Sequence, residues 1–310
     1  MRTRFITLLI IFTLLGSNSI SANEELSLNT IDTILVSEET KFSDLVPGTQ
    51  RVIRWFDGVK KTDLSIVYLH GFSASSKEIS PTTELLADKL NANIFYSRLT
   101  GHGRSEDAML DGNIEAWLKD TTQAYNIGAL IGRNVIIIST STGGTLATWL
   151  SAQPFAKQLL ANIMISPNYG IKSKFGRIIK WPWGLTIAKW LNGPYYSFEP
   201  LNEVHRRYWT ERYPVEAIPP MLQLIDLVED IDKSVIQIPQ LIIYSPDDQV
   251  INTAKIEKTI THFTNSPVTV ERYNNSIDPA QHVLSGDACS PESTAEVVEM
   301  IDTYVRSLIN

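Results

Sequence analysis

The chain has 310 residues, of which 43% are apolar and 20% charged, so wholesale disorder and a multi-span membrane protein are both excluded. Its 34 acidic and 27 basic residues give a net charge of −7, which argues against nucleic acid as the main partner, because phosphate binding needs a basic surface. The single cysteine, Cys289, excludes an internal disulfide framework and a multi-cysteine zinc site. The five histidines show no metal-ligand spacing, and we expect neither a metal nor a cofactor.

Residues 1–22 have the three-part pattern of a secretory signal peptide. Arg2 and Arg4 give a basic start, a mostly apolar run of 11 residues follows, and a small, polar stretch ends at Ala22. The apolar run is short for a membrane span of about 20 residues, which favours cleavage after Ala22 over an uncleaved membrane anchor. We therefore expect a periplasmic or extracellular protein with no stable membrane span. Because the segment holds two basic and no acidic residues, the mature chain would carry a net charge of −9.

Short apolar runs bounded by turn residues predict strands, and the longer stretches between them predict helices. The expected strands are Arg51–Phe56, Ser65–Leu69, Asn93–Arg98, Val135–Ser139, Asn162–Ser166, Leu241–Tyr244 and Val268–Tyr273, with Thr33–Val36 as a further edge strand. The expected helices are Thr82–Leu90, Ile114–Ile131, Gly143–Ala152, Thr253–Phe263 and Ser293–Leu308. Several strands are continuously apolar, as in strands buried on both faces of a parallel sheet. The alternation predicts a mostly parallel, doubly wound α/β sheet with right-handed crossovers.

Residues 167–239 break this alternation. They contain four of the seven tryptophans and five of the eleven tyrosines, and prolines divide them into short pieces. We interpret them as a helical insertion on top of the sheet, which leaves residues 23–166 and 240–310 as the core. The aromatic side chains either pack a small core within the insertion or face a pocket beneath it, where they would form a lid over an apolar ligand. Both roles are compatible.

The segment Ile138–Gly144 joins an expected strand to an expected helix and has the small-x-Ser-x-Gly form of a nucleophile elbow. So tight a turn needs small residues two before and two after Ser141, and Ser139 and Gly143 meet that need. The helix N-terminus at this point favours negative charge. Ser139 is the weaker nucleophile, because a serine instead of a glycine lies two residues after it. The alternative is an ordinary strand-to-helix turn rich in Gly, Ser and Thr.

A second motif, His70-Gly71-Phe72, ends an earlier expected strand. In hydrolases with a serine elbow, a backbone N–H of this loop and the N–H after the nucleophile together hold the oxyanion. The donors here would be the N–H groups of Phe72 and Thr142, and Gly71 would let the backbone approach closely. For the His70 side chain we favour a structural role, with a hydrogen bond inside its own loop.

Two further motifs follow strands in the C-terminal part of the chain. The strand Leu241–Tyr244 runs into an acidic turn with Asp247 and Asp248, and His282 follows the last strand. Taken separately, the acidic pair could be a solvated turn or a helix cap, and His282 an ordinary loop histidine. The order Ser, Asp, His, each at the carboxyl end of a strand, is that of a hydrolase triad. The joint occurrence of four motifs in this order favours a triad of Ser141, one of the two aspartates and His282.

These motifs are similar to those of the α/β-hydrolase superfamily, and within it to those of bacterial carboxylesterases and monoacylglycerol lipases. The similarity spans roughly residues 50–308, and is carried by Leu69–Phe72, Arg98–Ser105, the turn at Ser141, Asp248–Val250 and His282. It implies an α/β-hydrolase fold and a structural role for His102 in the Gly-His-Gly loop. The Asp-x-Val pattern of the family selects Asp248 over Asp247 as the acid. The chain departs from the family at Ser139, where glycine is usual, and in the insertion, which matches only in position and character.

The chemistry implied by the resemblance is acyl transfer through a covalent intermediate on Ser141. His282 would act as the base, Asp248 would orient it, and the substrate would be a small-molecule acyl ester with an apolar part. A serine at the elbow argues against dehalogenase and epoxide-hydrolase chemistry. The same residues also serve thioesterases, amidases, peptidases and acyltransferases. A non-catalytic, exported binding protein of the same fold is the alternative from another class.

Overall fold

The computed structural model describes residues 26–179 and 181–309. The signal peptide expected at residues 1–22 lies outside these ranges, so it stays a prediction. Across residues 26–179 and 181–309, no helix is both long and apolar enough to cross a membrane.

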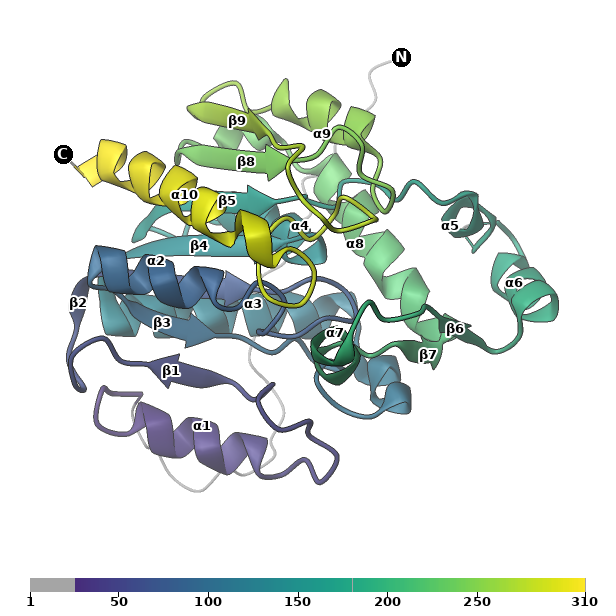
Figure 1. Cartoon of the computed structure of the whole chain (residues 1–310), viewed down its shortest axis with the longest axis horizontal. Coiled ribbons are helices and arrows are strands. Elements are labelled where there is room, and N and C mark those ends of the chain that lie inside the picture. Colours follow the sequence, from purple (N-terminus) through teal and green to yellow (C-terminus); the bar gives the residue numbers. More distant parts are fainter. Residues whose placement is uncertain (1–25, 180, 310) are drawn as a thin grey trace, which may run out of the picture.

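A seven-stranded sheet forms the centre of the molecule (Figure 1). In spatial order its strands are β1 (Val52–Arg54), β3 (Asn93–Tyr96), β2 (Thr62–Leu69), β4 (Gly132–Thr140), β5 (Leu159–Ile165), β8 (Gln240–Tyr244) and β9 (Val268–Arg272). Only β1 runs antiparallel to its neighbour in this sheet, which confirms the predicted mostly parallel α/β class. Leu69 pairs with Ser139 in the register of β2 and β4, so the loops that leave these two strands begin side by side. The seven strands expected between residues 51 and 273 are all present, with ends that differ by a few residues.

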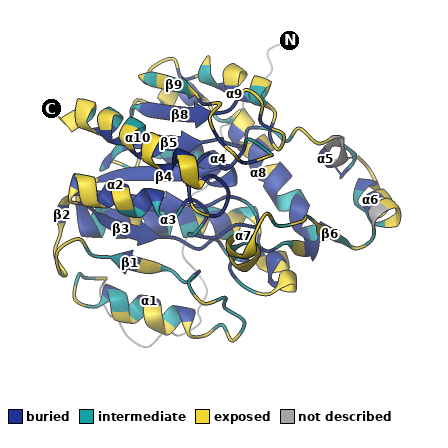
Figure 2. Cartoon of the chain, in the orientation of Figure 1, coloured by how far each residue is buried: buried dark blue, intermediate teal, exposed yellow. Residues whose placement is uncertain are grey.

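Helices cover both faces of the sheet (Figure 1). Their bounds are α1 (Ile31–Glu39), α2 (Thr82–Leu90), α3 (Ile114–Ile131), α4 (Thr142–Ser151), α9 (Thr253–Ile260) and α10 (Thr294–Ile309). On β2, Ile66 and Tyr68 enter the apolar cluster shared with α2 and α10, whereas Val67 and Leu69 enter the cluster shared with α1, α3, α4 and α9. All four side chains are completely buried (Figure 2). Successive strand residues point to opposite faces, so a strand covered on both faces needs an unbroken apolar run.

The edge strand expected at Thr33–Val36 is wrong, because this segment lies inside helix α1. Its β-branched and apolar residues suggested a strand, but the buried positions are Ile31, Leu35 and Glu39, which repeat every four residues as on a helix face. Val36 is mostly exposed. The helix is fixed by a buried ion pair, in which Arg98 donates two hydrogen bonds to the Glu39 carboxylate at 2.7 and 2.9 Å. Such a pairing between distant segments cannot be seen in a window of four residues.

Residues 167–239 form mostly short helices, and they also contain a two-stranded antiparallel sheet that the sequence analysis missed. The helices are α5 (Lys174–Ile179), α6 (Gly184–Asn192), α7 (Glu203–Tyr208) and α8 (Ile218–Asp230), and the strands are β6 (Tyr195–Ser197) and β7 (Arg212–Pro214). Short 3₁₀ turns occur at Glu106–Asp111, Val215–Ala217, Lys233–Val235 and Pro291–Ser293. Strands of three residues are too short to give an alternating pattern in the sequence.

Helix α8 is built into the main core. Its buried residues, among them Leu222, Ile225 and Val228, belong to the same apolar cluster as Leu146 and Leu150 of α4. Figure 1 places α8 beside α4, whereas α5 and α6 stand away from the sheet at the right of the view.

Candidate active site

Ser141 occupies a strained turn between β4 and α4. Its backbone has φ 53° and ψ −116°, a left-handed conformation that residues other than glycine rarely adopt. The turn is so tight that a Cβ on Gly143 would lie 2.0 Å from the carbonyl oxygen of Leu69. The structure therefore gives a physical reason for the small-x-Ser-x-Gly spacing: the turn presses the start of α4 against the end of β2, and only glycine fits.

Ser139 and Thr142 lie on either side of this serine. Ser139 is completely buried in β4, and its hydroxyl donates to the carbonyl oxygen of Ile163 at 3.2 Å. The small side chain expected there thus fills the position where glycine is usual and is held by the neighbouring strand. Thr142 is the first residue of α4, where backbone N–H groups have no partner within the helix. Its N–H is therefore available for the oxyanion role expected of it.

The loop after β2 lies directly against Ser141. A Cβ on Gly71 would lie 3.2 Å from the Cβ of Ser141, so the backbone of this loop approaches the serine as closely as glycine allows. The ring of Phe72 packs edge-on against His102, Trp117 and Tyr213, with ring centroids 5.3 to 6.2 Å apart. This packing fixes the position of Phe72, whose N–H is the second expected oxyanion donor.

Asp248 and His282 form a hydrogen bond of 2.7 Å between Oδ2 and Nδ1. The other carboxylate oxygen of Asp248 accepts from the N–H groups of Val250 and Ile251 at 2.7 and 2.9 Å. Asp248 is 1% exposed, whereas Asp247 is exposed, and its hydrogen bonds are made by its backbone: its N–H donates to the Ser245 hydroxyl and its carbonyl oxygen accepts from the Gln249 side chain. Of the two aspartates that the sequence offered, the structure brings Asp248 into contact with the histidine.

The loop that carries His282 is held by a second buried carboxylate, Asp278. One oxygen of Asp278 accepts from the N–H groups of His282 and Val283, both at 2.9 Å, and the other accepts from Ala280 at 2.9 Å. Burial by itself would lower the pKa of His282, but the Asp248 carboxylate, with smaller contributions from Glu78 and Asp278, raises it above its ordinary value. Because Nδ1 is engaged by Asp248, Nε2 is the ring nitrogen left to exchange a proton with a hydroxyl group.

Ser141 and His282 line the same cavity, which has a volume of about 390 Å³. Volumes of roughly 300 to 1,000 Å³ are usual for small-molecule sites. Its aromatic and apolar lining includes Phe72, Tyr196, Phe198, Trp209, Tyr213 and Met221. Several of these residues come from 167–239, so some aromatic side chains of that segment do face a pocket.

Glu78 is a residue of this cavity that the sequence analysis missed. It is 2% exposed, and one carboxyl oxygen accepts from the Gly71 N–H at 2.7 Å and from the Tyr68 hydroxyl at 2.8 Å. Burial raises its pKa to about 7. Glu78 therefore holds the loop that carries Phe72 and adds an ionisable group beside His282. No sequence pattern marks it, because a single glutamate in a polar loop is normally solvated.

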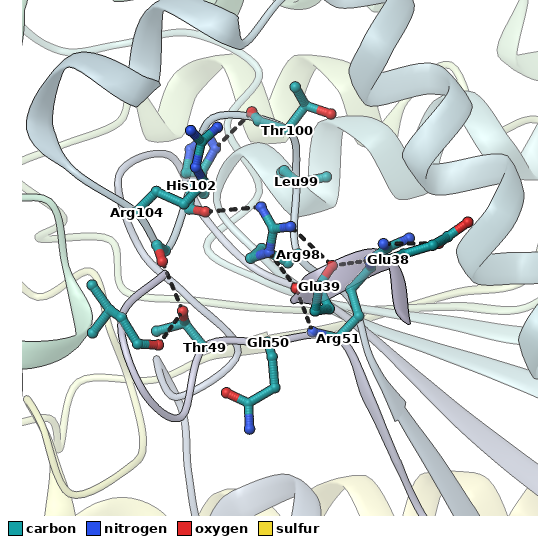
Figure 3. A network of polar contacts seen from close by, with 12 residues as sticks. Glu38, Glu39, Thr49, Gln50, Arg51, Arg98, Leu99, Thr100, His102 and Arg104 are labelled. Carbon is teal, nitrogen blue, oxygen red and sulfur yellow. Dashed lines mark hydrogen bonds and ion pairs between the residues drawn. The ribbon is translucent and has the colours of Figure 1, made fainter. Parts of the chain in front are cut away.

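Two further histidines are structural. His70 bonds to the carbonyl oxygen of Gly71 at 2.8 Å, within its own loop as expected, and burial lowers its pKa to about 4. His102 bonds to the carbonyl oxygen of Thr100, and burial also lowers its pKa. Figure 3 shows that this Gly-His-Gly loop is anchored by Arg98, which donates to the carbonyl oxygen of His102 and to Glu39. The buried, neutral His102 ring packs against Phe72 and Trp117, so it supports the loop of Phe72 from behind.

The comparisons with known proteins agree with this fold. The family model described as serine aminopeptidase, S33, matches residues 60–277, which is more than half of the chain and ends just before His282. A comparison with curated proteins gives no significant match.

Three solved structures illustrate the likeness. A metagenome-derived lipolytic enzyme is 18% identical with a TM-score of 0.66, over 85% of this chain and 99% of that one. A monoacylglycerol lipase from Paleococcus ferrophilus is 15% identical with a TM-score of 0.59, over 83% and 98%. A soluble variant of monoglyceride lipase from Saccharomyces cerevisiae is 12% identical with a TM-score of 0.59, over 84% and 91%. At these identities the likeness shows the fold alone. Because the family model covers most of the sheet and the turn at Ser141, the chain belongs to the serine aminopeptidase S33 family of α/β-hydrolases, the superfamily that its motifs indicated.

Proposed function

We propose that this protein is a serine hydrolase that cleaves carboxylic acyl esters through an acyl-enzyme intermediate. The observation that carries the proposal is the 2.7 Å bond between Asp248 and His282, whose ring lines the same cavity as the strained Ser141. A buried carboxylate that orients a histidine, next to a serine lifted into a cavity, is the arrangement that activates a hydroxyl as a nucleophile.

In the proposed mechanism, Ser141 Oγ attacks the ester carbonyl carbon while Nε2 of His282 takes its proton. Asp248 stabilises the charged imidazole, and the N–H groups of Phe72 and Thr142 hold the oxyanion, each lowering the barrier by on the order of 3 kcal/mol. Collapse of the tetrahedral intermediate expels the alcohol, to which His282 returns the proton. Water then attacks the acyl-enzyme by the same steps and releases the acid.

The ester preference rests on the cavity. Its aromatic and apolar lining suits a substrate with an apolar acyl or alcohol part. Lipolytic and monoacylglycerol lipase activities are named for proteins of this fold that resemble the chain, which supports the same choice. We also propose that residues 167–239 act as a lid, because Tyr196, Phe198 and Trp209 from this segment line the same cavity as Ser141.

A graded panel of p-nitrophenyl esters, from acetyl to palmitoyl, tests the proposal against aminoacyl p-nitroanilides of matched size. We expect ester turnover that varies with chain length and disappears in Ser141→Ala. Turnover of the anilides alone would instead favour a peptidase, in line with the description of the family. Products that appear only with an added alcohol acceptor would indicate an acyltransferase. No turnover of any substrate, together with no covalent labelling of the serine, would favour a binding protein.

Export remains part of the proposal and rests on the signal-peptide pattern of residues 1–22. N-terminal sequencing of the protein from a secreting host should begin at Asn23. A protein that starts at residue 1 and stays with the membrane fraction would indicate the uncleaved anchor.

A further inference from the structure

Helix α6 and the residue before it expose several large apolar side chains. Trp183 and Trp190 are 82% and 83% exposed, more than any other large apolar side chain in the described ranges. Ile187 and Leu191 are also exposed, and positions 187, 190 and 191 have the spacing of a single helix face, with Trp183 directly before the helix. Contiguous apolar surface of this kind marks an interaction site rather than an ordinary protein surface.

The opposite face of α6 packs against helix α5. Gly184 and Ala188, one turn apart, are buried, and a Cβ on Gly184 would lie 1.9 Å from the carbonyl oxygen of Ile178 in α5. Helix α6 therefore packs its small residues tightly against α5 and turns its tryptophans outward. Figure 1 shows both helices standing away from the sheet, and Figure 2 shows exposed residues on α6. The outward direction of the α6 tryptophan side chain therefore follows from the tight packing of the opposite face of α6 against α5.

The charge of this segment differs from that of the rest of the chain. Residues 170–198 contain five basic residues and no acidic residue, although the whole chain has a net charge of −7. Lys189 of α6 pairs with Glu216, and the Lys172 ammonium donates to the carbonyl oxygen of Asp248, which is neutral. A basic, tryptophan-bearing segment on an acidic protein is attracted to an anionic surface, while the remainder of the protein is repelled from it.

We propose that the exposed face of α6 docks the protein on anionic lipid membranes. Indole rings favour the membrane–water interface because they combine a large apolar surface with a polar N–H group. The basic residues of the segment 170–198 supply the attraction to anionic headgroups. The segment adjoins the cavity on both sides, because Ile171 precedes α5 and Tyr196 follows α6 and both line it. Docking would therefore hold the cavity close to the lipid surface. The proposal does not depend on ester hydrolysis.

Vesicle co-sedimentation of the full protein tests the docking. The probes are large unilamellar vesicles of phosphatidylcholine alone and of phosphatidylcholine with phosphatidylglycerol at 7:3. We expect binding to the anionic vesicles at low salt, at least tenfold weaker binding to the neutral ones, and a fall of at least fivefold in 0.5 M NaCl. Trp183→Ala/Trp190→Ala should lower binding to anionic vesicles at least tenfold, with an unchanged circular dichroism spectrum.

Val36→Ala/Phe56→Ala is the matched control, because both side chains are exposed and apolar but lie near α1 and β1, away from α6. It should bind as the wild type does. No binding to either vesicle, or equal binding by the tryptophan variant and the wild type, would overturn the proposal. So would a wild-type dimer in light scattering that becomes monomeric in the tryptophan variant, since the face would then bind a second copy of the chain. None of these outcomes depends on whether the protein hydrolyses esters.

Discussion

Replacing Ser141 by glycine should stabilise the protein relative to replacing it by alanine. Both variants lack the hydroxyl, so they differ only in the Cβ, which alanine keeps in the unfavourable backbone conformation of φ 53° and ψ −116°. Such a conformation costs a residue other than glycine on the order of 1–3 kcal/mol. Glycine also lowers the free energy of unfolding by about 0.4–1 kcal/mol relative to alanine, because its unfolded state is more flexible. The net expectation is that Ser141→Gly is more stable than Ser141→Ala by about 1 kcal/mol, and by up to about 2.

Urea unfolding followed by circular dichroism measures this difference, with Ser37 as the control position. Ser37 is exposed in α1, where the backbone is helical, so glycine should be less stable there than alanine by about 1 kcal/mol. The account therefore predicts opposite signs at the two positions. If Ser141→Gly is less stable than Ser141→Ala by the margin found at Ser37, the turn is not strained and the elbow interpretation fails.

Four further predictions concern single residues. Asp248→Asn should lower kcat for ester hydrolysis by on the order of 10⁴. It should also move the acidic limb of the pH–rate profile to lower pH, because Asp248 raises the pKa of His282. Asp247→Asn should change kcat less than threefold, and the reverse ranking would transfer the role to Asp247. Glu78→Gln should gain up to about 3 kcal/mol of unfolding free energy relative to the wild type between pH 5 and pH 8. Burial raises the pKa of Glu78 from its ordinary 4.5 to about 7, so the stability that the protonated carboxyl group provides is complete below pH 4.5 and is lost as pH rises through 7. A difference that does not change with pH would refute this. Gly143→Ala should lose at least about 4 kcal/mol or fail to fold, since its Cβ would overlap the Leu69 carbonyl, and a fold of wild-type stability in urea would contradict the geometry. Cys289→Ser should keep activity nearly intact in the same ester assay, because burial raises the pKa of the thiol and leaves little reactive thiolate, and a large loss would reveal a role for the thiol.

Much of the fold follows from local patterns. Strands buried on both faces, such as β4, need an unbroken apolar run, and helices such as α3 repeat their apolar residues with the helical period, so both are visible in short windows. Helix α1 and the β6–β7 pair were missed for the opposite reason. The first is fixed by an ion pair with Arg98, 59 residues away, and the second consists of strands too short to show a period.

The site residues also fall into two groups, those that a local sequence pattern reveals and those that depend on tertiary contacts. The spacing around Ser141 could be read because a tight turn forces small residues at fixed positions, which the clash at Gly143 explains. The choice of Asp248 came from a family pattern, and its physical reason is tertiary: the carboxylate that accepts from Val250 and Ile251 is also the one that reaches His282. Glu78 could not be found from the sequence, because its burial depends on tertiary hydrogen bonds that its carboxylate accepts from the Gly71 N–H and the Tyr68 hydroxyl.

Covalent labelling with a fluorophosphonate probe, followed by peptide mass spectrometry, tests the central claim most directly. The reagent reacts with a serine only when a neighbouring base activates its hydroxyl. The account predicts one adduct, on Ser141, which is absent in Ser141→Ala and forms far more slowly in His282→Ala. An adduct on another serine such as Ser139, or labelling of Ser141 at an unchanged rate without the His282 imidazole, would contradict it.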